Sequence, residues 1–268
     1  MTENTNGGLI SVVMPAYKQE KTICEDLISV KNNLESLGLN FEIVVVADGA
    51  MDSTYDQALM VSDPRMKVFG YPGRNRGKGY ALRFGAAKAS GDRVVFLDAG
   101  MDINPSGIAM LLAHMDWYQA DAVIGSKRHP VSRVEYPLVR RITSIGYQLL
   151  VKILFGLNVK DTQTGIKIFR RELLEKVMPR LLVKDYAIDI ELLAVAYHLG
   201  FKRIYEAPVS INHQFASLTQ GSMIRVIFRM LKDTLAVFYR LKIKHYYDDG
   251  NERKWVFDPE LQMAVNVG

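Results

Sequence analysis

Residues 93–102 read Arg-Val-Val-Phe-Leu-Asp-Ala-Gly-Met-Asp, an apolar run that ends abruptly in two carboxylates, Asp98 and Asp102. A continuous run of β-branched and aromatic residues is typical of a strand that is buried on both faces, as in a parallel sheet covered by helices. Ligands of such sheets bind outside the carboxyl ends of the strands. Carboxylates delivered there suit Mg²⁺ or Mn²⁺ bound to a diphosphate compound. The alternative is that Asp98 only caps the next helix.

Strand-like and helix-like segments alternate on both sides of this run. Apolar strands are predicted at 9–14, 41–47, 66–71, 92–97 and 121–125, and helices at 20–37, 53–62, 77–90 and 105–119. After residue 125 we predict helices at 139–156, 189–199 and 222–243, and strands at 165–169 and 208–213. Such alternation predicts an α/β fold, with a mostly parallel, twisted sheet and helices on both faces.

Composition narrows the class of protein. The 268-residue chain is 49% hydrophobic and 24% charged, as expected for a globular protein. Its single cysteine, Cys24, excludes an internal disulfide framework and suits a reducing compartment. The five histidines show no zinc-ligand spacing. A net charge of +5 implies an anionic partner, but the basic residues are split between a loop and a helix, which argues against nucleic acid.

No targeting or membrane-spanning segment is visible in the sequence. The first residues lack the charged and apolar regions of a signal peptide, and no stretch reaches 18 apolar residues free of charge. We therefore expect a cytoplasmic protein that does not span a membrane by itself. The expected organisation is a disordered tail at 1–8, a main domain at 9–215, a helix at 216–247 and a loosely attached tail at 248–268.

Four polar segments follow predicted strands or open a predicted helix. They are Pro15-Ala16-Tyr17-Lys18-Gln19-Glu20, Asp48-Gly49-Ala50-Met51-Asp52-Ser53-Thr54, Asn75-Arg76-Gly77-Lys78-Gly79 and Asp98 to Asp102. The first two offer a tyrosine ring and carboxylates for a base and a ribose, and the third offers backbone N–H groups and cations for phosphate. Each is weak alone, because Asp-Gly also forms plain turns, Gly-Lys-Gly also opens plain helices, and Asp52-Ser53 also forms a plain N-cap.

Together these segments make the chain resemble the family 2 glycosyltransferases of GT-A fold. Among them it resembles most the dolichyl- or polyprenyl-phosphate sugar synthases, such as dolichol-phosphate mannosyltransferase. The resemblance covers residues 9–215 and includes Gly125-Ser126-Lys127-Arg128 and Asp161-Thr162-Gln163-Thr164-Gly165. It implies an inverting transfer of a hexose, mannose or glucose, from GDP-mannose or UDP-glucose to a polyprenyl or dolichyl phosphate. It also implies Mg²⁺ or Mn²⁺ as cofactor.

The resemblance also assigns residues to the site. It makes Asp98 a metal ligand; from the residues themselves we expect Asp102 to be the other ligand, and Asp98, Arg128 and Asp189 to be the catalytic residues. It places the donor nucleotide against Pro15, Ala16, Tyr17, Gln19, Glu20, Asp48, Gly49, Asn75, Gly77, Lys78, Asp98 and Ala99.

Three positions depart from the family pattern. Lys18-Gln19 stands where the family has Asn-Glu, Ala47 stands at the first position of Asp-Asp-Gly, and Gly100 stands at the last position of the Asp-x-Asp metal motif. Asp102 is the candidate to replace the missing metal ligand. If Asp102 does not bind the metal, the alternatives are a weak metal site or a protein that binds a nucleotide sugar without turnover.

Basic residues gather after the predicted strand at 121–125. A phosphate monoester acceptor is already anionic near neutral pH, because its second pKa is about 6, so it needs cations to position it rather than a general base. We predict an acceptor-phosphate site formed by Lys127, Arg128, Arg133 and Arg141, with a solvated basic loop as the alternative. A transferase acting on a glycan hydroxyl would instead need a general-base carboxylate.

Four further polar residues have more than one interpretation. Asp161 and Gln163 are expected either to line the sugar pocket, to orient the arginines or to cap a turn. Asp189 and Glu191 take part in the site, or they simply open a helix, where carboxylates are favoured by the helix dipole whatever the function.

The predicted helix at 222–243 is amphipathic. Its apolar residues are Ile224, Ile227, Phe228, Leu231, Leu235 and Phe238, and Arg225, Arg229, Lys232 and Arg240 form another stripe. A basic amphipathic helix is typical of attachment to a membrane surface. We therefore expect peripheral binding on the cytosolic face of a membrane, directly or through a small transmembrane partner. The alternative is that the helix packs on the domain core with its basic stripe in water.

Overall fold

A computed structural model of the chain describes residues 8–100, 103–132, 138–185, 187–210, 220–251 and 254–267. Within these ranges, only the backbone is described for residues 138–144 and 220–227. The predictions that fall outside this description concern residues 1–7, Asp102, Arg133, residues 211–213 and the side chains of Arg141, Ile224, Arg225 and Ile227.

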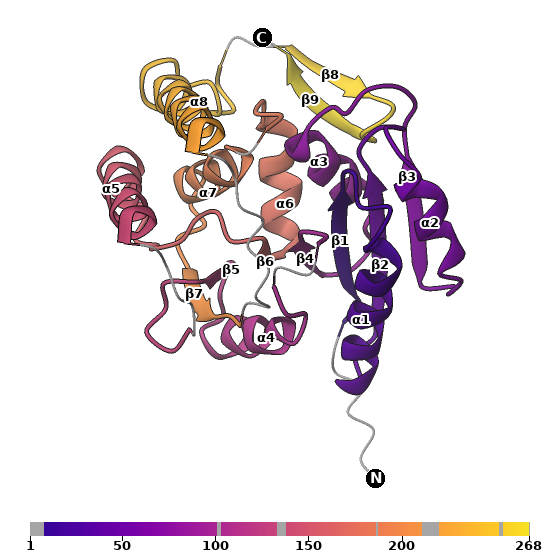
Figure 1. The fold of residues 1–268 in the computed structure, drawn as a ribbon. Coiled ribbons are helices and arrows are strands. Elements are labelled where there is room, and N and C mark those ends of the chain that lie inside the picture. Colours follow the sequence, from indigo (N-terminus) through magenta and orange to yellow (C-terminus); the bar gives the residue numbers. More distant parts are fainter. Residues whose placement is uncertain are drawn as a thin grey trace.

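The described strands β1 to β7 form one sheet, in the order β3-β2-β1-β4-β6-β5-β7. Their bounds are β1 (Ile10–Ala16), β2 (Phe41–Ala47), β3 (Met66–Gly70), β4 (Arg93–Leu97), β5 (Ala122–Ser126), β6 (Ile166–Arg170) and β7 (Ile204–Pro208). β6 runs antiparallel to both of its neighbours, β4 and β5, whereas the other pairs are parallel. The prediction of an α/β fold with a mostly parallel sheet is confirmed (Figure 1).

Helices cover both faces of the sheet. They are α1 (Ile23–Ser36), α2 (Thr54–Met60), α3 (Lys78–Lys88), α4 (Gly107–Trp117), α5 (Leu138–Phe155), α6 (Arg171–Val177), α7 (Ile188–His198) and α8 (Gln220–Phe238), with a 3-10 turn η1 (Met178–Arg180) and a π-helical turn η2 (Tyr239–Ile243). Because successive strand residues point to opposite faces, Val12 packs in the core under α1 and α4, and Val13 packs in the core under α3, α6 and α7. Two apolar cores therefore fix the sheet between two helical layers.

The carboxyl ends of β1, β2, β4 and β5 lie at one edge of the sheet, because these strands run in the same direction. β6 starts at this edge, since it is antiparallel, and its first residue, Ile166, pairs with Leu97 at the end of β4. Pro15, which has no N–H to donate, is tolerated in β1 because pairing with β4 ends at Val13. The polar segments predicted from the sequence therefore converge on this edge.

Two elements after residue 165 differ from the prediction. Of the late strand expected at 208–213, the described residues 208–210 place only Pro208 in a strand, because β7 ends there and pairs in parallel with β5 through residues 204–208. Helix α6 was not predicted, since it is only seven residues long and begins directly after β6. Its apolar residues, Leu173, Leu174 and Val177, are buried against the sheet.

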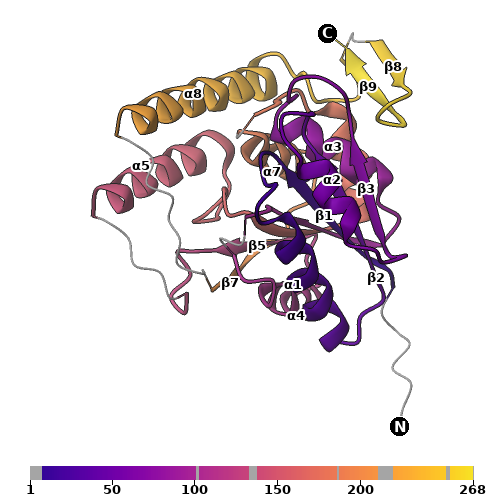
Figure 2. The same ribbon diagram turned by 45° about the vertical axis from the view of Figure 1, so that its right-hand side comes forward.

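The C-terminal segment is also different from the loosely attached tail that we expected. Residues 254–267 form an antiparallel hairpin of β8 (Lys254–Asp258) and β9 (Met263–Val267), which lies beside α3 (Figures 1 and 2). Leu261, between the two strands, is buried in the same core as Val13, under α3, α6 and α7. Glu260 forms an ion pair with Arg76 (2.6 Å), in the loop before α3. The hairpin is therefore packed against the main domain.

Candidate active site

The loops that follow β1 and β2 are joined by hydrogen bonds. The N–H of Gln19 donates to Thr54 Oγ1 (2.8 Å), and the N–H of Ser53 donates to Glu20 Oε2 (3.2 Å). The Asp52 carboxylate accepts from the N–H of Thr54 (3.1 Å) and from the N–H of Glu20 (3.4 Å), while Ser53, the N-cap residue of α2, makes no side-chain capping hydrogen bond. Asp52 and Glu20 therefore hold the two loops together.

Asp48 ties the loop after β2 to the loop before α3. Its buried carboxylate accepts hydrogen bonds from the N–H of Arg76 (2.7 Å), the N–H of Gly77 (3.0 Å) and the hydroxyl of Tyr71. Gly49 has a φ of +87°, and a Cβ there would lie 2.7 Å from a backbone nitrogen of the loop before α3. Only glycine allows this approach. Asp48 thus shapes the loop that we expected to bind phosphate.

The remaining predicted donor residues lie at the same edge. Pro15 and Ala16 end β1, and the ring of Tyr17 is exposed directly after them. Ala99 follows β4 and is half-buried. Asn75 is exposed in the loop before α3. An exposed aromatic ring and a shaped backbone loop therefore lie together where the sequence predicts nucleotide binding.

Asp98 stands at the end of β4, where the sequence predicts it. Its N–H donates to Gly165 O (2.8 Å), before β6, and its side chain is 40% exposed. A Cβ at Gly165 would lie 2.6 Å from Asp98 Oδ2, so the carboxylate packs directly on this glycine. The Nζ of Lys78, from the first turn of α3, lies 2.7 Å from the same oxygen. Asp98 is therefore half-open to solvent on one side and paired with a cation on the other.

A line of alternating charges continues from Asp98 into the interior. Lys78 Nζ is also 3.6 Å from Asp189 Oδ2, and Asp189 Oδ1 is 2.8 Å from Lys167 Nζ, on β6. The side chains of Asp189 and Lys167 are only 5% and 2% exposed. Burial alone would raise the pKa of Asp189, but attraction to Lys167 and Lys78 outweighs it and holds the pKa below its usual value. Asp189 thus lies behind Lys78 as a buried, ionised group rather than at the surface.

Gly100, at the position of the missing metal ligand, lies next to Gln19, which also departs from the family pattern. Gly100 has a φ of +112°, and a Cβ there would lie 3.5 Å from Gln19 Nε2. Neither residue carries a carboxylate, and the described residues contain no group of three His, Cys, Asp or Glu side chains that could hold a metal ion. Asp98 alone still fits Mg²⁺ or Mn²⁺, because such ions are often held by one or two carboxylates, water and the phosphates of the substrate.

The basic loop after β5 is held by the segment before β6. The Asp161 carboxylate accepts from the N–H of Lys127 (3.1 Å), and Arg128 Nη1 donates to Lys160 O (3.1 Å). Asp161 also accepts from the N–H of Gln163 (3.3 Å), as in its predicted role of capping a turn, so it joins this turn to the backbone of the basic loop. Gln163 points instead toward α8, where its Nε2 lies 3.5 Å from Met230 Sδ. Since β4 and β5 are two strand spacings apart, Asp98 and the basic loop are separated by about 10 Å along this edge.

Sequence reasoning missed Lys167 and the segment at 181–185. A lysine between Ile166 and Ile168 has the alternation of a half-exposed strand, so nothing local indicates that it is buried. The N–H of Gly79 donates to Lys184 O (2.8 Å), and a Cβ at Gly77 would lie 2.2 Å from that oxygen. The Gly77-x-Gly79 spacing was the only local signal of this close contact.

Comparison with known proteins shows similarity in sequence and similarity in fold. The family profile described as Glycosyl transferase family 2 matches residues 11–178. A dolichyl-phosphate beta-glucosyltransferase of Trichomonas vaginalis is 31% identical over 87% of this chain and 74% of its own length. The dolichyl-phosphate beta-glucosyltransferase of Saccharomyces cerevisiae is 29% identical over 90% of this chain and 77% of its own length.

Solved structures agree at the level of the fold. Glucosyl-3-phosphoglycerate synthase from Mycobacterium tuberculosis, in complex with Mn²⁺, UDP and phosphoglyceric acid, aligns with a TM-score of 0.63 and 24% identity over 93% of this chain and 82% of its own. Mannosyl-3-phosphoglycerate synthase from Rubrobacter xylanophilus aligns with a TM-score of 0.68 and 17% identity over 97% and 86% of the two chains. The GT-A fold predicted from the sequence is confirmed by these alignments.

Proposed function

The chain belongs to glycosyl transferase family 2 and is a nucleotide-sugar-dependent glycosyltransferase, and we propose that it transfers glucose from UDP-glucose to a polyprenyl or dolichyl phosphate with inversion. The observation that carries this proposal is the shared sheet edge, with the Asp98–Lys78 pair after β4 and the basic loop of Lys127 and Arg128 after β5. Glucose is favoured over mannose because the relatives named above are glucosyltransferases.

The two charged groups match the two needs of the reaction. An oxygen of the acceptor phosphate attacks the anomeric carbon in line, while the bond from that carbon to the nucleoside diphosphate breaks. Lys78 is placed to neutralise charge that grows on the leaving diphosphate, and a fixed cation of this kind lowers the barrier. The acceptor is already anionic, so Arg128 and Lys127 position it and no general base is required.

A divalent cation fits the donor side of this site. Asp98 would hold Mg²⁺ or Mn²⁺ together with diphosphate oxygens, and Asp102, which lies outside the described residues, remains the proposed second ligand. When bound, such an ion would add positive charge beside the leaving group.

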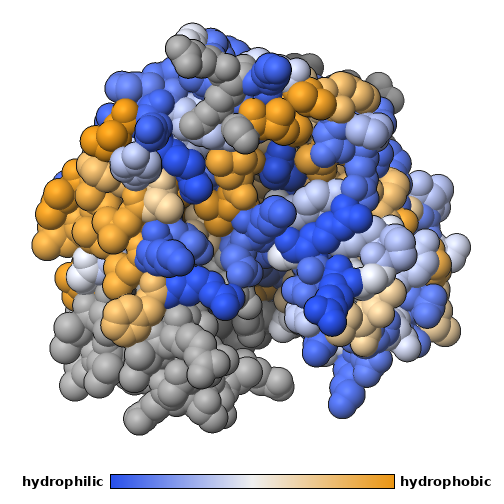
Figure 3. Space-filling model, turned by 90° about the horizontal axis from the view of Figure 1, so that it is seen from above, coloured by the Kyte–Doolittle hydropathy of each residue, from blue (hydrophilic) through white to orange (hydrophobic). Residues whose placement is uncertain are grey.

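Helices α5 and α8 offer a surface for the lipid part of the acceptor. They lie side by side on one flank of the molecule, where Tyr147 Oη and Thr234 Oγ1 are 2.8 Å apart (Figures 1 and 2). Among the side chains that the structure describes, the large apolar ones exposed on these elements are Ile145, Leu149 and Ile153 of α5, and Phe228, Leu235, Tyr239 and Ile243 of α8 and η2. Hydrophobic side chains gather on that flank in the space-filling view (Figure 3). No helix among the described residues is both long and apolar enough to cross a bilayer.

We therefore propose that this flank rests on the cytosolic face of a membrane. Ile153→Glu is expected to weaken binding to vesicles of phosphatidylcholine and phosphatidylglycerol by about tenfold, because burying one large aliphatic side chain contributes roughly 1.5–3 kcal/mol. Met60→Glu is the matched control, since Met60 and Ile153 are both 71% exposed and Met60 lies on α2. Equal loss in both variants, measured by co-sedimentation, would contradict a membrane contact through α5.

Arg128 is the residue that we expect to bind the acceptor phosphate. Arg128→Ala should raise the acceptor KM by roughly tenfold or more, since a charge-assisted hydrogen bond contributes about 1.5–3 kcal/mol, and the donor KM should stay unchanged. Lys176→Ala, which removes one positive charge from α6, controls for net charge. If Arg128→Ala changed the donor KM alone, Arg128 would belong to the donor site.

A transfer assay tests the proposed function directly. Purified protein is mixed with polyprenyl phosphate, Mn²⁺ or Mg²⁺ and radiolabelled UDP-glucose or GDP-mannose, with and without EDTA. Label that enters the lipid phase from UDP-glucose supports the proposal, whereas label from GDP-mannose alone overturns the choice of donor. Binding of both nucleotide sugars is measured separately. If one of them binds but neither labels the lipid, the acceptor is a glycan hydroxyl or the protein does not turn over. The neutral pair Gln19 and Gly100 favours the latter.

A further inference from the structure

A cavity of 720 Å³ lies between α3, the segment before α7 and the C-terminal hairpin. Its polar walls include Arg76 and Arg83 on the α3 side, Lys184 before α7, and Asp258 and Asn266 on the hairpin. Of the predicted donor residues, only Asn75 lines it. The cavity is therefore a neighbour of the donor site rather than part of it, and the proposed glycosyl transfer makes no use of it.

The guanidinium of Arg83, which lines this cavity, has a hydrogen-bond donor that the described residues leave unsatisfied. Its Nε is buried and has no hydrogen-bond partner among the residues that the structure describes. Burial lowers the pKa of Arg83, although Glu191 and Asp258 are close enough to oppose this shift. An unmade hydrogen bond of a buried guanidinium costs free energy. Because Arg83 also lines the cavity, an anionic acceptor that reaches this guanidinium from the cavity would be bound favourably.

The other walls define what kind of molecule carries that acceptor. Asn266 is 3% exposed, and its Oδ1 is likewise buried without a hydrogen-bond partner in the described part of the chain. Leu181, Leu261 and Val265 supply an apolar wall. A ligand that satisfies all three features has an anionic group, a hydrogen-bond donor and an apolar or aromatic body. A volume of 720 Å³ is within the range of cavities that hold such molecules.

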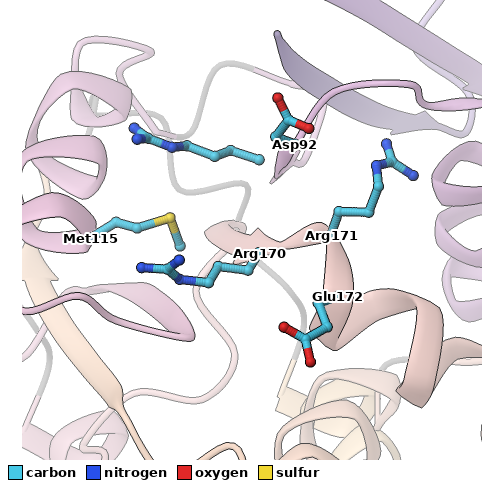
Figure 4. Close-up of a pocket in the computed structure, with 6 residues that line it drawn as sticks. Asp92, Met115, Arg170, Arg171 and Glu172 are labelled. Atoms are coloured by element: carbon cyan, nitrogen blue, oxygen red, sulfur yellow. The ribbon is translucent and has the colours of Figure 1, made fainter. Parts of the chain in front are cut away.

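A second cavity, of 290 Å³, is also lined by arginines: Arg93, Arg170 and Arg171 (Figure 4). Arg170 and Arg171 point in opposite directions there, so they do not converge on one ligand. Arg93 is paired with Asp116 (2.7 Å), and Arg170 Nε donates to Ala120 O (2.7 Å). Arg171 Nε donates to Gly91 O (2.6 Å), although Arg171 Nη2 is, like Arg83 Nε, buried without a hydrogen-bond partner in the described part of the chain. Each arginine of this second cavity is therefore anchored by at least one hydrogen bond or ion pair within the protein.

We propose that the cavity beside α3 binds a small organic phosphate, whose anionic group contacts Arg83 and Lys184 and whose body lies against Leu181, Leu261 and Val265. The site adjoins the proposed donor loop, since Arg76 lines the cavity and donates its N–H to Asp48. Glu260 of the hairpin holds the Arg76 guanidinium (2.6 Å). A ligand in the cavity therefore contacts the loop that Asp48 shapes, which makes the site a means of regulating donor binding.

Calorimetric titration of the full chain with adenosine monophosphate, inorganic phosphate and adenosine tests this proposal. Adenosine monophosphate is expected to bind saturably and more tightly than either of the other two probes. Arg83→Gln should weaken that binding at least tenfold. Lys88→Gln, which removes one positive charge from the same helix without lining the cavity, should leave it unchanged.

Two further measurements locate the site. Arg83→Gln should keep or raise the thermal unfolding midpoint, because it removes a buried unpaired donor, so lost binding cannot be ascribed to unfolding. Lys78→Gln reports binding at the donor diphosphate position. Retained binding in Lys78→Gln together with loss in Arg83→Gln supports the proposal. The reverse pattern, or no saturable binding to the unmodified protein, overturns it. Because binding is measured directly, this result does not depend on the glycosyl acceptor.

Discussion

Asp98→Ala is expected to lower the transfer rate by roughly 10³-fold, the largest effect that we expect from a single substitution at the site. Asp98 is the carboxylate at the end of β4, and its Oδ2 lies 2.7 Å from Lys78 Nζ. Without it, Lys78 keeps only Asp189, at 3.6 Å, and its ammonium moves away from the position beside the leaving diphosphate. A candidate ligand for the metal ion is lost as well.

The kcat/KM of Asp98→Ala is measured with radiolabelled UDP-glucose, alongside circular dichroism to show that the variant is folded. Asp98→Asn keeps the size of the side chain and should be nearly as inactive, because the charge is what pairs with Lys78. Asp116→Ala is the matched control, since Asp116 is an exposed aspartate that pairs with Arg93 at the opposite end of β4. Activity within a few-fold of the unmodified protein in Asp98→Ala would contradict the role of Asp98.

The part of the fold that carries the proposed donor site was predictable because its signals are local. β2 and β4 are apolar runs buried on both faces, and each is followed directly by a polar loop. Parallel strands then bring these loops to one edge, so Asp48 and Asp98 were placed correctly without any knowledge of tertiary contacts. The precise roles of the donor residues came from resemblance to a family, since Asp-Gly and Gly-Lys-Gly have plain structural uses too.

The rest of the site depends on contacts between distant segments. The direction of β6 cannot be read from its residues, because a strand at 166–170 has the same pattern whether it runs parallel or antiparallel. Lys167 meets Asp189 only because α7 packs over that strand. Likewise, the hairpin at 254–267 contacts the rest of the chain through Leu261 and the Arg76–Glu260 ion pair, and neither contact leaves a local signal.

The buried pair of Lys167 and Asp189 leads to the second large effect. Asp189→Asn is expected to lower the free energy of unfolding by about 3–5 kcal/mol, because it leaves the ammonium of Lys167 without its charged partner at 2% exposure. Lys167→Met should cost less, since Asp189 keeps Lys78 at 3.6 Å. The double variant Lys167→Met/Asp189→Asn removes both buried charges and should regain most of the stability. Denaturant unfolding of the three variants measures these differences.

Activity of the same double variant separates support of the fold from positioning of Lys78. If the pair positions Lys78, the double variant is stable but its donor KM rises about tenfold, because Lys78 is then held by Asp98 alone. The matched control is Glu172→Gln/Lys176→Met, which removes an exposed ion pair of α6 and should change neither stability nor KM. A double variant with unchanged donor KM would show that Lys167 and Asp189 serve only the fold, and that Asp98 by itself fixes the cation at the leaving diphosphate.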